Sequence, residues 1–368
     1  MKIIYFVQSL VSCWNNGHAH FLRGVLRELA ARGHTIRAYE PSNGWSRTNL
    51  IAEHGQQVLH SFHQCFPELS PTEYGPDFDL EQALTGADLV IVHEWNDPSL
   101  VAKVGRLRSR GAKFLLLFHD THHRAISDPA AMRNYDLSGY DGVLAFGQAL
   151  AEIYRKWGWG DRAFIWHEAA DTRLFRPPET EERRRGLVWV GNWGDEERTA
   201  ELHDYLFAPV ARMRAPLDVY GVRYPEQAVA QLHGLGIAYQ GWLPNNAVPK
   251  VFAAHQATVH VPRRYYAEAL AGIPTIRVFE ALACGIPLIS APWEDVEALF
   301  RAGDFLIARS PPEMEQHLRA VLQDSKLRVH LAERGLATIK ARHTCGHRAD
   351  ELLAITRRIR APAKESVL

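Results

Sequence analysis

Short apolar runs, each long enough for one buried strand, recur along the chain and constrain its fold more than any other feature. The first, Lys2–Val11, is almost continuously apolar, which is typical of a strand covered on both faces. A turn follows at Asn15-Asn16-Gly17-His18, and apolar residues then recur at helical spacing from Phe21 to Leu29. Gly33 ends this helix before a second strand at Thr35–Tyr39. Strand, turn, helix and strand in this order open a doubly wound α/β sheet.

The same pattern continues through both halves of the chain. It predicts strands at 88–93, 113–120, 141–146 and 163–166, and then at 187–190, 217–220, 237–239, 258–261 and 288–289. Helices are expected between them, with further ones near 247–254, 293–301, 312–323, 326–340 and 347–360. Ligands bind beyond the carboxyl ends of such strands, and in the first half these ends carry His93 and Glu94 and then His119 and Asp120.

A length of 368 residues exceeds what one core usually supports, so two domains are expected. Between Glu168 and Arg185 the apolar pattern gives way to a proline pair and a run of charges, as in a linker. We therefore predict a Rossmann-like domain at 1–168, a linker at 169–186 and a second Rossmann-like domain at 187–345. A C-terminal helix and tail follow at 346–368, and whether this helix crosses back to the first domain is left open. A ligand is expected in the cleft between two such halves.

The composition limits the classes of partner. With 42 basic and 42 acidic residues the formal charge is zero, which gives no global attraction to nucleic acid. Cysteines at positions 13, 65, 284 and 345 lack CxxC spacing, which argues against structural zinc or a disulfide framework. The first apolar run is too short for a signal peptide, and no segment is long enough to span a membrane. The expected location is the cytoplasm, with peripheral membrane association left open.

The stretch Thr275–Ser290 is the strongest candidate binding element. Its apolar residues have helical spacing, and Gly285 follows where a left-handed helix end needs no Cβ. The free amides at the helix start, about Thr275 to Arg277, suit a phosphate, and the Glu280 carboxylate one turn later suits sugar hydroxyls. A capped core helix with an Arg277–Glu280 ion pair is the alternative interpretation.

Other polar residues are weaker candidates. His119, in the run His119-Asp120-Thr121-His122-His123, could contact substrate hydroxyls or act as a general base; the run could also hold zinc or iron, although its spacing fits no known ligand motif. His18 is preferred over His20 as a histidine that reaches a ligand. Arg198, Arg263 and Arg264 could each hold a diphosphate or could be solvated surface charges.

Two strings are set aside. Asp77-Phe78-Asp79 has the form of a metal-dependent sugar-transferase motif, but it lies in loop sequence and is interpreted as chance. The glycines form neither a GxGxxG fingerprint nor a Walker loop, which argues against dinucleotide oxidoreductases and P-loop enzymes.

The chain resembles the two-domain nucleotide-sugar glycosyltransferases of GT-B fold, in which two Rossmann-like domains face each other across a cleft. Its closest resemblance is to the CgeB-like branch, a glycosyltransferase family 1 type. The matching stretches are 277–289, the linker entry 170–177, Val190-Gly191-Asn192 with Arg198, and 342–348. In the first half the resemblance is mainly topological and rests on 16–18, 92–94 and 118–120.

The resemblance implies a metal-independent, hexosyltransferase-type enzyme that needs no cofactor and uses a nucleotide-sugar donor such as a UDP-sugar. It implies that Glu280 binds the ribose, that the amides of Thr275 and Ile276 bind the diphosphate, and that Arg198 and Arg277 supply positive charge. Asn192 belongs to the donor site, and main chain at Trp242 and Leu243 would flank the base. The acceptor, which could be a saccharide, a lipid-linked molecule, a protein or a small molecule, would enter near His18, Glu94 and His119, the expected catalytic residues.

One departure from the family pattern concerns the donor sugar. Many retaining relatives carry a second glutamate eight residues before the ribose-binding one, and this chain has Gly272 there. The stereochemical outcome is therefore open. The alternatives are a sugar-nucleotide-binding protein without transfer activity, a nucleotide-sugar epimerase, or a metal hydrolase built on His119–His123.

Overall fold

The computed structural model describes residues 1–179 and 184–361, and contacts divide the chain into two units that are discontinuous in sequence. The first unit comprises Met1–Ser12, Leu22–His167 and Cys345–Leu368, and the second comprises Cys13–Phe21 and Glu168–Thr344. Residues 180–183 of the predicted linker and 362–368 of the predicted tail lie outside the described residues. Among the described residues, no helix combines the length and the apolar character that crossing a membrane requires.

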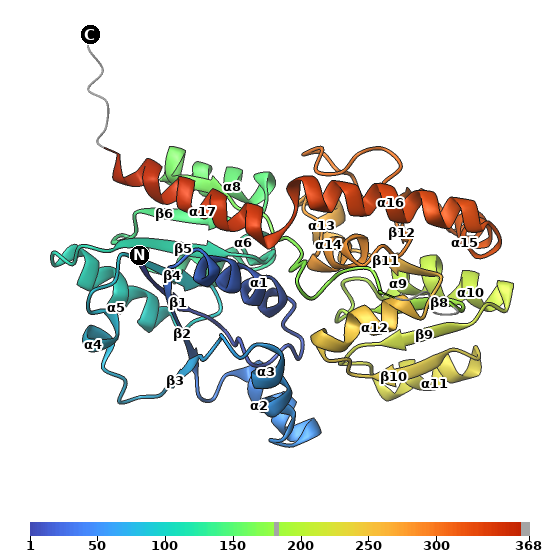
Figure 1. The fold of residues 1–368 in the computed structure, drawn as a ribbon, viewed down its shortest axis with the longest axis horizontal. Coiled ribbons are helices and arrows are strands. Elements are labelled where there is room, and N and C mark those ends of the chain that lie inside the picture. The colour runs from blue at the N-terminus through green and yellow to red at the C-terminus, as the bar shows by residue number, and fades with distance from the viewer. Residues whose placement is uncertain (180–183, 362–368) are drawn as a thin grey trace, which may run out of the picture. The chain divides into compact units, whose positions relative to one another are not determined.

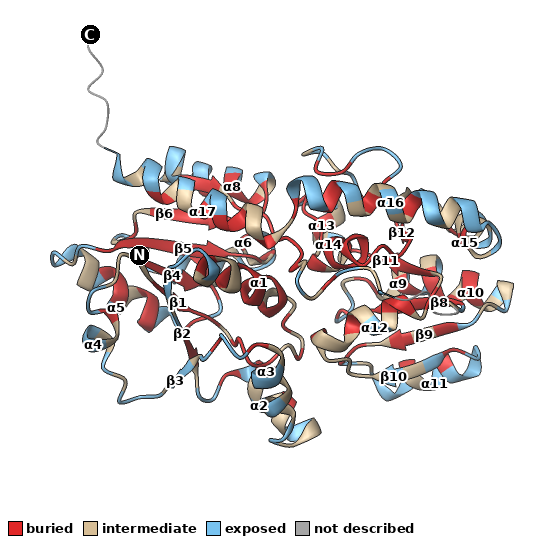
Figure 2. Cartoon of the chain, in the orientation of Figure 1, coloured by how far each residue is buried: buried red, intermediate tan, exposed pale blue. Residues whose placement is uncertain are grey.

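The first unit contains a seven-stranded parallel sheet in the order β3-β2-β1-β4-β5-β6-β7 (Figure 1). Its strands are β1 (Lys2–Phe6), β2 (Thr35–Pro41), β3 (Thr72–Tyr74), β4 (Leu89–His93), β5 (Leu115–Asp120), β6 (Gly142–Ala145) and β7 (Ala163–Ile165). The central strands β1, β4 and β5 are buried on both faces, as Figure 2 shows, which explains their continuous apolar runs.

Helices connect and cover these strands. They are α1 (His18–Ala31), α2 (Trp45–His54), α3 (Val58–Cys65), α4 (Leu80–Leu84), α5 (Pro98–Ser109), α6 (Arg124–Ser127), α7 (Pro129–Arg133), α8 (Gln148–Tyr154), the π-helical turn η1 (Arg155–Trp159), the short 3₁₀ turn η2 (Gly160–Arg162) and α17 (Cys345–Arg360). The last helix, α17, packs on β7 through a hydrogen bond of 2.9 Å from the Trp166 indole to the Arg348 carbonyl. The C-terminal helix is therefore part of the first unit.

The second unit contains a six-stranded parallel sheet in the order β10-β9-β8-β11-β12-β13. Its strands are β8 (Leu187–Val190), β9 (Leu217–Tyr220), β10 (Ala238–Gly241), β11 (Ala257–His260), β12 (Leu288–Ser290) and β13 (Leu306–Ile307). Its helical elements are α9 (Thr199–Leu202), η3 (His203–Phe207), α10 (Ala208–Met213), α11 (Glu226–Gly234), η4 (Asn245–Ala247), α12 (Val248–Ala253), α13 (Arg264–Glu268), α14 (Ile276–Ala283), α15 (Pro311–Gln323) and α16 (Ser325–Arg342).

Strand β8 shows why this sheet is covered on both faces. Leu187 and Trp189 belong to one hydrophobic cluster, with residues of η3, α10 and α15. Val188 and Val190 belong to a second cluster, with residues of α12 and α14. Because successive side chains of a strand point to opposite faces, one apolar run feeds two cores. The predicted α/β fold with two parallel sheets is confirmed.

Two local predictions are wrong, and two short strands were not predicted. The first strand ends at Phe6 instead of Val11, because the Glu40 carboxylate accepts hydrogen bonds from the amides of Leu10 and Val11 at 2.6 and 3.2 Å. The helix expected at 293–301 is a loop, in which the Asp295 carboxylate accepts from two downstream amides at 2.9 and 2.7 Å. The short strands β3 and β13 were not predicted, because their partly exposed residues show no apolar run.

Asp79 of the Asp-x-Asp string caps α4 by accepting a hydrogen bond from the Gln82 amide at 3.0 Å. The interpretation of that string as loop sequence is confirmed, and at least one of its carboxylates has a structural role.

Candidate functional site

The predicted binding helix α14 forms the centre of the candidate site in the second unit. Thr275 precedes it without a side-chain cap, so the amides of Ile276 and Arg277 have no acceptor within the helix. Gly285 ends the helix with φ of +63°, as its position after the last apolar residue predicts. The helix start thus offers backbone donors, and the predicted α14–turn–β12 arrangement is confirmed.

Glu280 is fully buried in α14 and both of its carboxylate oxygens are engaged. Arg277 donates to Oε2 at 2.5 Å, which is the ion pair of the alternative interpretation. His20 Nδ1 and the Asn245 amide donate to Oε1 at 2.8 and 3.1 Å. A carboxylate has about four acceptor positions, so these three bonds leave room for one further donor such as a hydroxyl.

The charges around Glu280 fix its ionisation. Burial acts to raise the pKa of Glu280, but the Arg277 guanidinium and His20 outweigh it, and the pKa lies below the ordinary value. Burial likewise acts to lower the pKa of His20, but Glu280 and a hydrogen bond with Cys13 outweigh it and leave the pKa raised. The carboxylate is therefore ionised and rigidly held, as an acceptor for sugar hydroxyls needs to be.

The segment Cys13–Phe21, a loop followed by the first turn of α1, is part of the same unit and connects α14 to the next part of the site. The Asn192 side-chain amide donates to the Asn15 side chain. A Cβ added to Gly17 would lie 3.3 Å from Ile276 Cγ2, so the glycine allows the loop to approach the start of α14 closely. His18 lies 3.5 Å from Glu168, and burial lowers its pKa. His20, which sequence reasoning ranked below His18, is the histidine that contacts Glu280.

Arg198 is a buried cation just before α9. It donates to the carbonyls of Val261 and Asn192 at 3.1 and 2.6 Å, and its guanidinium lies 5.1 Å from the Trp189 ring. Among the described residues no acid forms an ion pair with it, and its Nε has no hydrogen-bond partner. Burial and the nearby Arg263 lower the pKa of Arg198 to about 9. A buried cation that forms no ion pair with any described acid indicates a site for an anion.

The other two candidate arginines differ from Arg198. Arg263 is paired with Glu197 at 2.6 Å, and Arg264 is paired with Glu201 at 3.2 Å. Both cations therefore have counter-charges within the protein, and Arg198 is the stronger anion ligand of the three.

His260 was not singled out in the sequence, although it lies at the carboxyl end of β11 beside the carbonyl that Arg198 binds. Its Nδ1 bonds to the Ser290 hydroxyl at 2.9 Å, and its buried Nε2 has no partner among the described residues. Burial and Arg198 lower the pKa of His260 to about 3, so the ring is neutral at physiological pH. Arg198 Nε and His260 Nε2 are thus two buried polar atoms at the carboxyl edge of β8, β11 and β12 that have no hydrogen-bond partner among the described residues.

The remaining predicted donor residues lie in the same unit. The Asn192 side-chain oxygen accepts from the Val222 amide at 3.1 Å, so this residue braces the loop after β8. Trp242 and Leu243 are half-buried and follow β10, directly before the 3₁₀ turn that contains Asn245. The second unit thus brings together Glu280, Arg277 and Asn245 at one point and Arg198, Asn192 and His260 at another. The segment Cys13–Phe21 contacts both groups, through His20 and Asn15.

Gly272 has a backbone that disfavours the glutamate of many retaining relatives. Its φ is +90°, a region that L side chains rarely adopt, and an added Cβ would lie 2.4 Å from Val296 Cγ2. The loop before α14 is therefore shaped for glycine.

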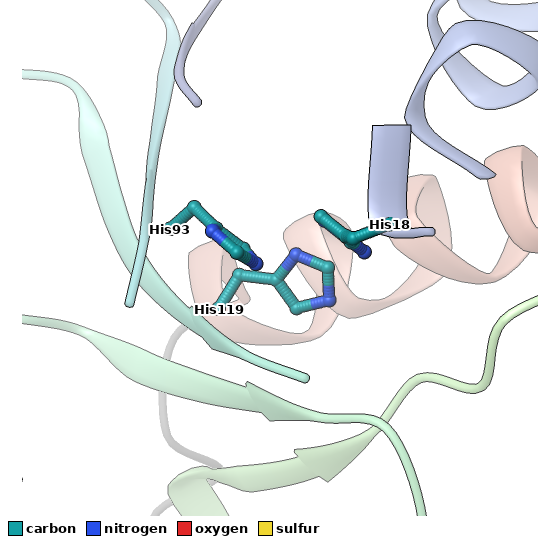
Figure 3. A group of neighbouring side chains, drawn as sticks. All are labelled: His18, His93 and His119. Atoms are coloured by element: carbon teal, nitrogen blue, oxygen red, sulfur yellow. The ribbon is translucent and has the colours of Figure 1, made fainter. Parts of the chain in front are cut away.

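In the first unit, His93 is the last residue of β4 and His119 the last but one of the neighbouring strand β5, and their rings lie 5.6 Å apart (Figure 3). Both are fully buried. His119 Nδ1 is hydrogen-bonded to the Tyr5 hydroxyl, and its ring lies 4.8 Å from Trp166. His93 Nε2 is bonded to the Thr121 hydroxyl at 2.9 Å. These contacts hold the two imidazoles in fixed orientations at the carboxyl edge of the sheet.

Glu94 is fully buried beside Asp120. Its oxygens accept from the Thr121 amide at 3.0 Å and from the Arg124 guanidinium at 3.0 and 2.9 Å. Burial and the Asp120 charge raise the pKa of Glu94 despite Arg124, and burial also raises the pKa of Asp120, which accepts from Tyr154 at 2.7 Å. The structure brings Glu94 and His119 to the same sheet edge but engages Glu94 in holding Arg124.

The polar run at 119–123 divides among separate partners. His119 is bonded to Tyr5, Asp120 to Tyr154, and His123 to the Ser127 hydroxyl at 2.9 Å, while the His122 ring lies 3.9 Å from that of His123. Within the described part of the chain this run does not form a group of ligands around one point. The five residues of the run therefore do not act together as one ligand group, although His119 itself belongs to a group of histidines that could hold a metal ion.

Comparisons with known proteins give a family match for part of the chain and similar folds for nearly all of it. Residues 198–354 match the model of a family described as glycosyl transferase-like. No curated protein sequence matches the chain. Among solved structures, sucrose-phosphate synthase from Thermosynechococcus elongatus is similar with a TM-score of 0.67 and 15% identity, over 98% of this chain and 99% of that chain.

Two further structures are similar over nearly their whole length. HepE from Anabaena, in complex with UDP and glucose, has a TM-score of 0.65 and 16% identity, over 96% of this chain and 98% of that chain. A mutant of TarM from S. aureus, in a complex that includes UDP, has a TM-score of 0.67 and 8% identity, over 97% and 100%. At these identities the similarity shows the fold, which is GT-B.

Proposed function

Because residues 198–354 match a glycosyl transferase-like family and the chain has the GT-B fold, we propose that the protein is a glycosyltransferase that uses a nucleoside-diphosphate sugar. UDP is the proposed nucleotide, since the similar HepE and TarM structures contain it. The acceptor is a hydroxyl-bearing molecule of unassigned class.

The observation that carries this proposal is the buried Arg198 guanidinium, which has no ion pair among the described residues. A diphosphate supplies the missing negative charge and can accept from Nε. Arg198 is also the first residue of the family match. The start of α14 adds the backbone donors of Ile276 and Arg277, and His260 Nε2 adds a neutral polar group.

We assign the ribose to Glu280, whose carboxylate is charged, buried and held by Arg277, His20 and Asn245. The main chain near Trp242 and Leu243 is assigned to the base. The shape of the loop at Gly272 leaves contacts to the donor sugar to other residues, and the stereochemical outcome stays open.

Transfer forms a bond between an acceptor oxygen and the anomeric carbon and breaks the bond from that carbon to the β-phosphate oxygen. Negative charge builds up on the leaving diphosphate, and Arg198 and the helix amides are preorganised to stabilise it. This supports metal-independent transfer without a cofactor. The acceptor hydroxyl gives up a proton, and His18 and His119 remain the proposed acceptors of that proton. Glu94 is proposed to position Arg124 and the ends of the strands.

The function is tested by incubating the protein with labelled UDP-sugars and a panel of hydroxyl acceptors, with EDTA present. Transfer to an acceptor, or slow donor hydrolysis without one, is the expected result. Binding without any turnover would favour a sugar-nucleotide-binding protein. Conversion of one UDP-sugar into another without an acceptor would favour an epimerase, and activity abolished by EDTA would contradict metal independence.

The CgeB-like assignment remains a proposal at the level of the branch. Cytoplasmic location with peripheral membrane association is likewise proposed, and the first unit has a surface that suits it.

A further inference from the structure

The segment between α8 and β7 exposes one tryptophan, Trp157, at the edge of the first sheet, where its ring lies 5.2 Å from that of Tyr154. It reads Trp157-Gly158-Trp159-Gly160, and Trp157 is 37% exposed. Gly158 and Gly160 have φ of +93° and +50°, and no atom lies within 4 Å of a Cβ added to either. The glycines thus shape a turn in open space, and the turn presents tryptophan at a surface where an apolar ring gains nothing from water.

Cations lie in and beside this segment. The Arg162 guanidinium lies 4.7 Å from the Trp159 ring, and Arg155 donates to the Ala163 carbonyl at 3.4 Å. Arg358, near the end of α17, lies 5.4 Å from the ring of Phe164, the next residue of β7. We call these side chains the tryptophan–arginine patch: Arg155, Lys156, Trp157, Trp159, Arg162 and Arg358.

The cations of this patch have no acidic partner among the residues that the structure describes. All four cations are exposed, and none forms an ion pair with an acid among residues 1–179 and 184–361. Two exposed acids belong to the same region, Asp161 and Glu152, and Glu152 accepts a hydrogen bond from Gln148. Because the whole chain has a formal charge of zero, this local excess is a feature of one surface and not of the composition.

We propose that the tryptophan–arginine patch docks the first unit on the surface of a bilayer that contains anionic lipid. Tryptophan prefers the boundary between headgroups and acyl chains, where its ring is buried and its N–H stays wet. Arginine and lysine beside it are attracted to anionic headgroups. This proposal is independent of glycosyl transfer and names the residues for peripheral association.

A bilayer fits this surface better than a nucleic acid does. Binding of single strands requires a basic groove that follows the phosphate backbone as well as stacking rings. Here the cations gather around one short turn, and Trp159 is already covered by Arg162. A flat anionic surface needs only the exposed ring and the cluster of charge.

The test is co-sedimentation of the full chain with vesicles of phosphatidylcholine alone or mixed with phosphatidylglycerol, at low salt. The wild type should bind only the mixed vesicles. Lys156→Gln should weaken binding about fivefold and Trp157→Ala about tenfold. Trp45→Ala, at a tryptophan that is 46% exposed in α2, is the matched aromatic control, and Arg319→Gln in α15 is the charge control.

Both controls should bind like the wild type. The proposal is overturned if the wild type does not sediment with mixed vesicles, or if Lys156→Gln and Trp157→Ala bind as tightly as the controls. Equal or tighter binding to a single-stranded oligonucleotide, weakened by the same two substitutions, would assign the patch to nucleic acid instead. UDP binding should be unchanged in each variant. A failure of the membrane-docking proposal can therefore be told apart from a failure of the proposed glycosyltransferase function.

Discussion

Replacing Arg198 with glutamine separates a functional cation from a structural one. Arg198 is buried, it donates to the carbonyls of Val261 and Asn192, and it has no ion pair among the described residues. The lowering of its pKa to about 9 corresponds to about 5 kcal/mol of bias against the charged form in the folded protein. A bound diphosphate would relieve that bias, so Arg198→Gln should lose affinity for UDP without losing stability in the absence of ligand.

Affinity for UDP should fall about 10- to 100-fold in Arg198→Gln, because a charge-assisted hydrogen bond contributes about 1.5–3 kcal/mol. Stability without ligand should stay the same or rise, since glutamine can still donate to one of the two carbonyls and carries no buried charge. Titration calorimetry measures the affinity, and denaturant unfolding measures the stability. Arg264→Gln is the matched control, because that exposed arginine is paired with Glu201 and should leave both quantities unchanged.

Two results would refute this reasoning. If Arg198→Gln binds UDP as tightly as the wild type, the buried guanidinium is not the diphosphate ligand. If the variant loses several kcal/mol of stability without ligand, Arg198 is a structural residue whose carbonyl contacts dominate. Arg198→Lys adds an internal check, since it keeps the charge but loses the planar fork and should bind UDP with intermediate affinity.

Further predictions concern other residues of the second unit. Glu280→Gln should weaken UDP binding about tenfold or more in calorimetry, and it should weaken UMP binding by the same factor, because both nucleotides contain the ribose. A loss of affinity for UDP alone would contradict the ribose assignment. Because the pKa of His20 is raised, its pairing with Glu280 stabilises the fold fully below the ordinary histidine pKa, and this contribution is lost as the pH rises through the raised value. In thermal unfolding, the difference in stability between the wild type and His20→Gln should therefore become smaller from pH 6 to alkaline pH. A difference that becomes larger would contradict this prediction. Gly272→Glu should lower stability by about 1–2 kcal/mol, since φ is +90° and Val296 must move; a denaturation midpoint equal to that of the wild type would show that the loop adapts freely.

The central strands were predictable from the sequence because burial on both faces leaves a continuous apolar run, as at 89–92 and 115–118. The edge strands β3 and β13 were not, since partly exposed residues carry no such signal. Helix α14 and its Arg277–Glu280 pair follow from spacing alone, because residues three apart share one helix face.

The partners of Glu280 could not be predicted in the same way. His20 is 260 positions away from Glu280 in sequence. His18 and His20 contact different acids, Glu168 and Glu280, because helix positions i and i+2 are separated by more than half a turn. Only the folded backbone of Cys13–Phe21 decides which histidine meets α14. His260 could not be predicted as a site residue, because its role depends on the proximity of Arg198, which no local sequence pattern reveals.

Hydrogen–deuterium exchange with and without UDP tests the central claim, that the second unit holds the nucleoside diphosphate at Arg198 and the start of α14. The account predicts slower exchange in peptides that cover 191–198 and 275–280 of the wild type, and no such change in Arg198→Gln at the same UDP concentration. Protection confined to the strand ends at Glu94 and Asp120 of the first unit, or equal protection in the variant, would contradict it.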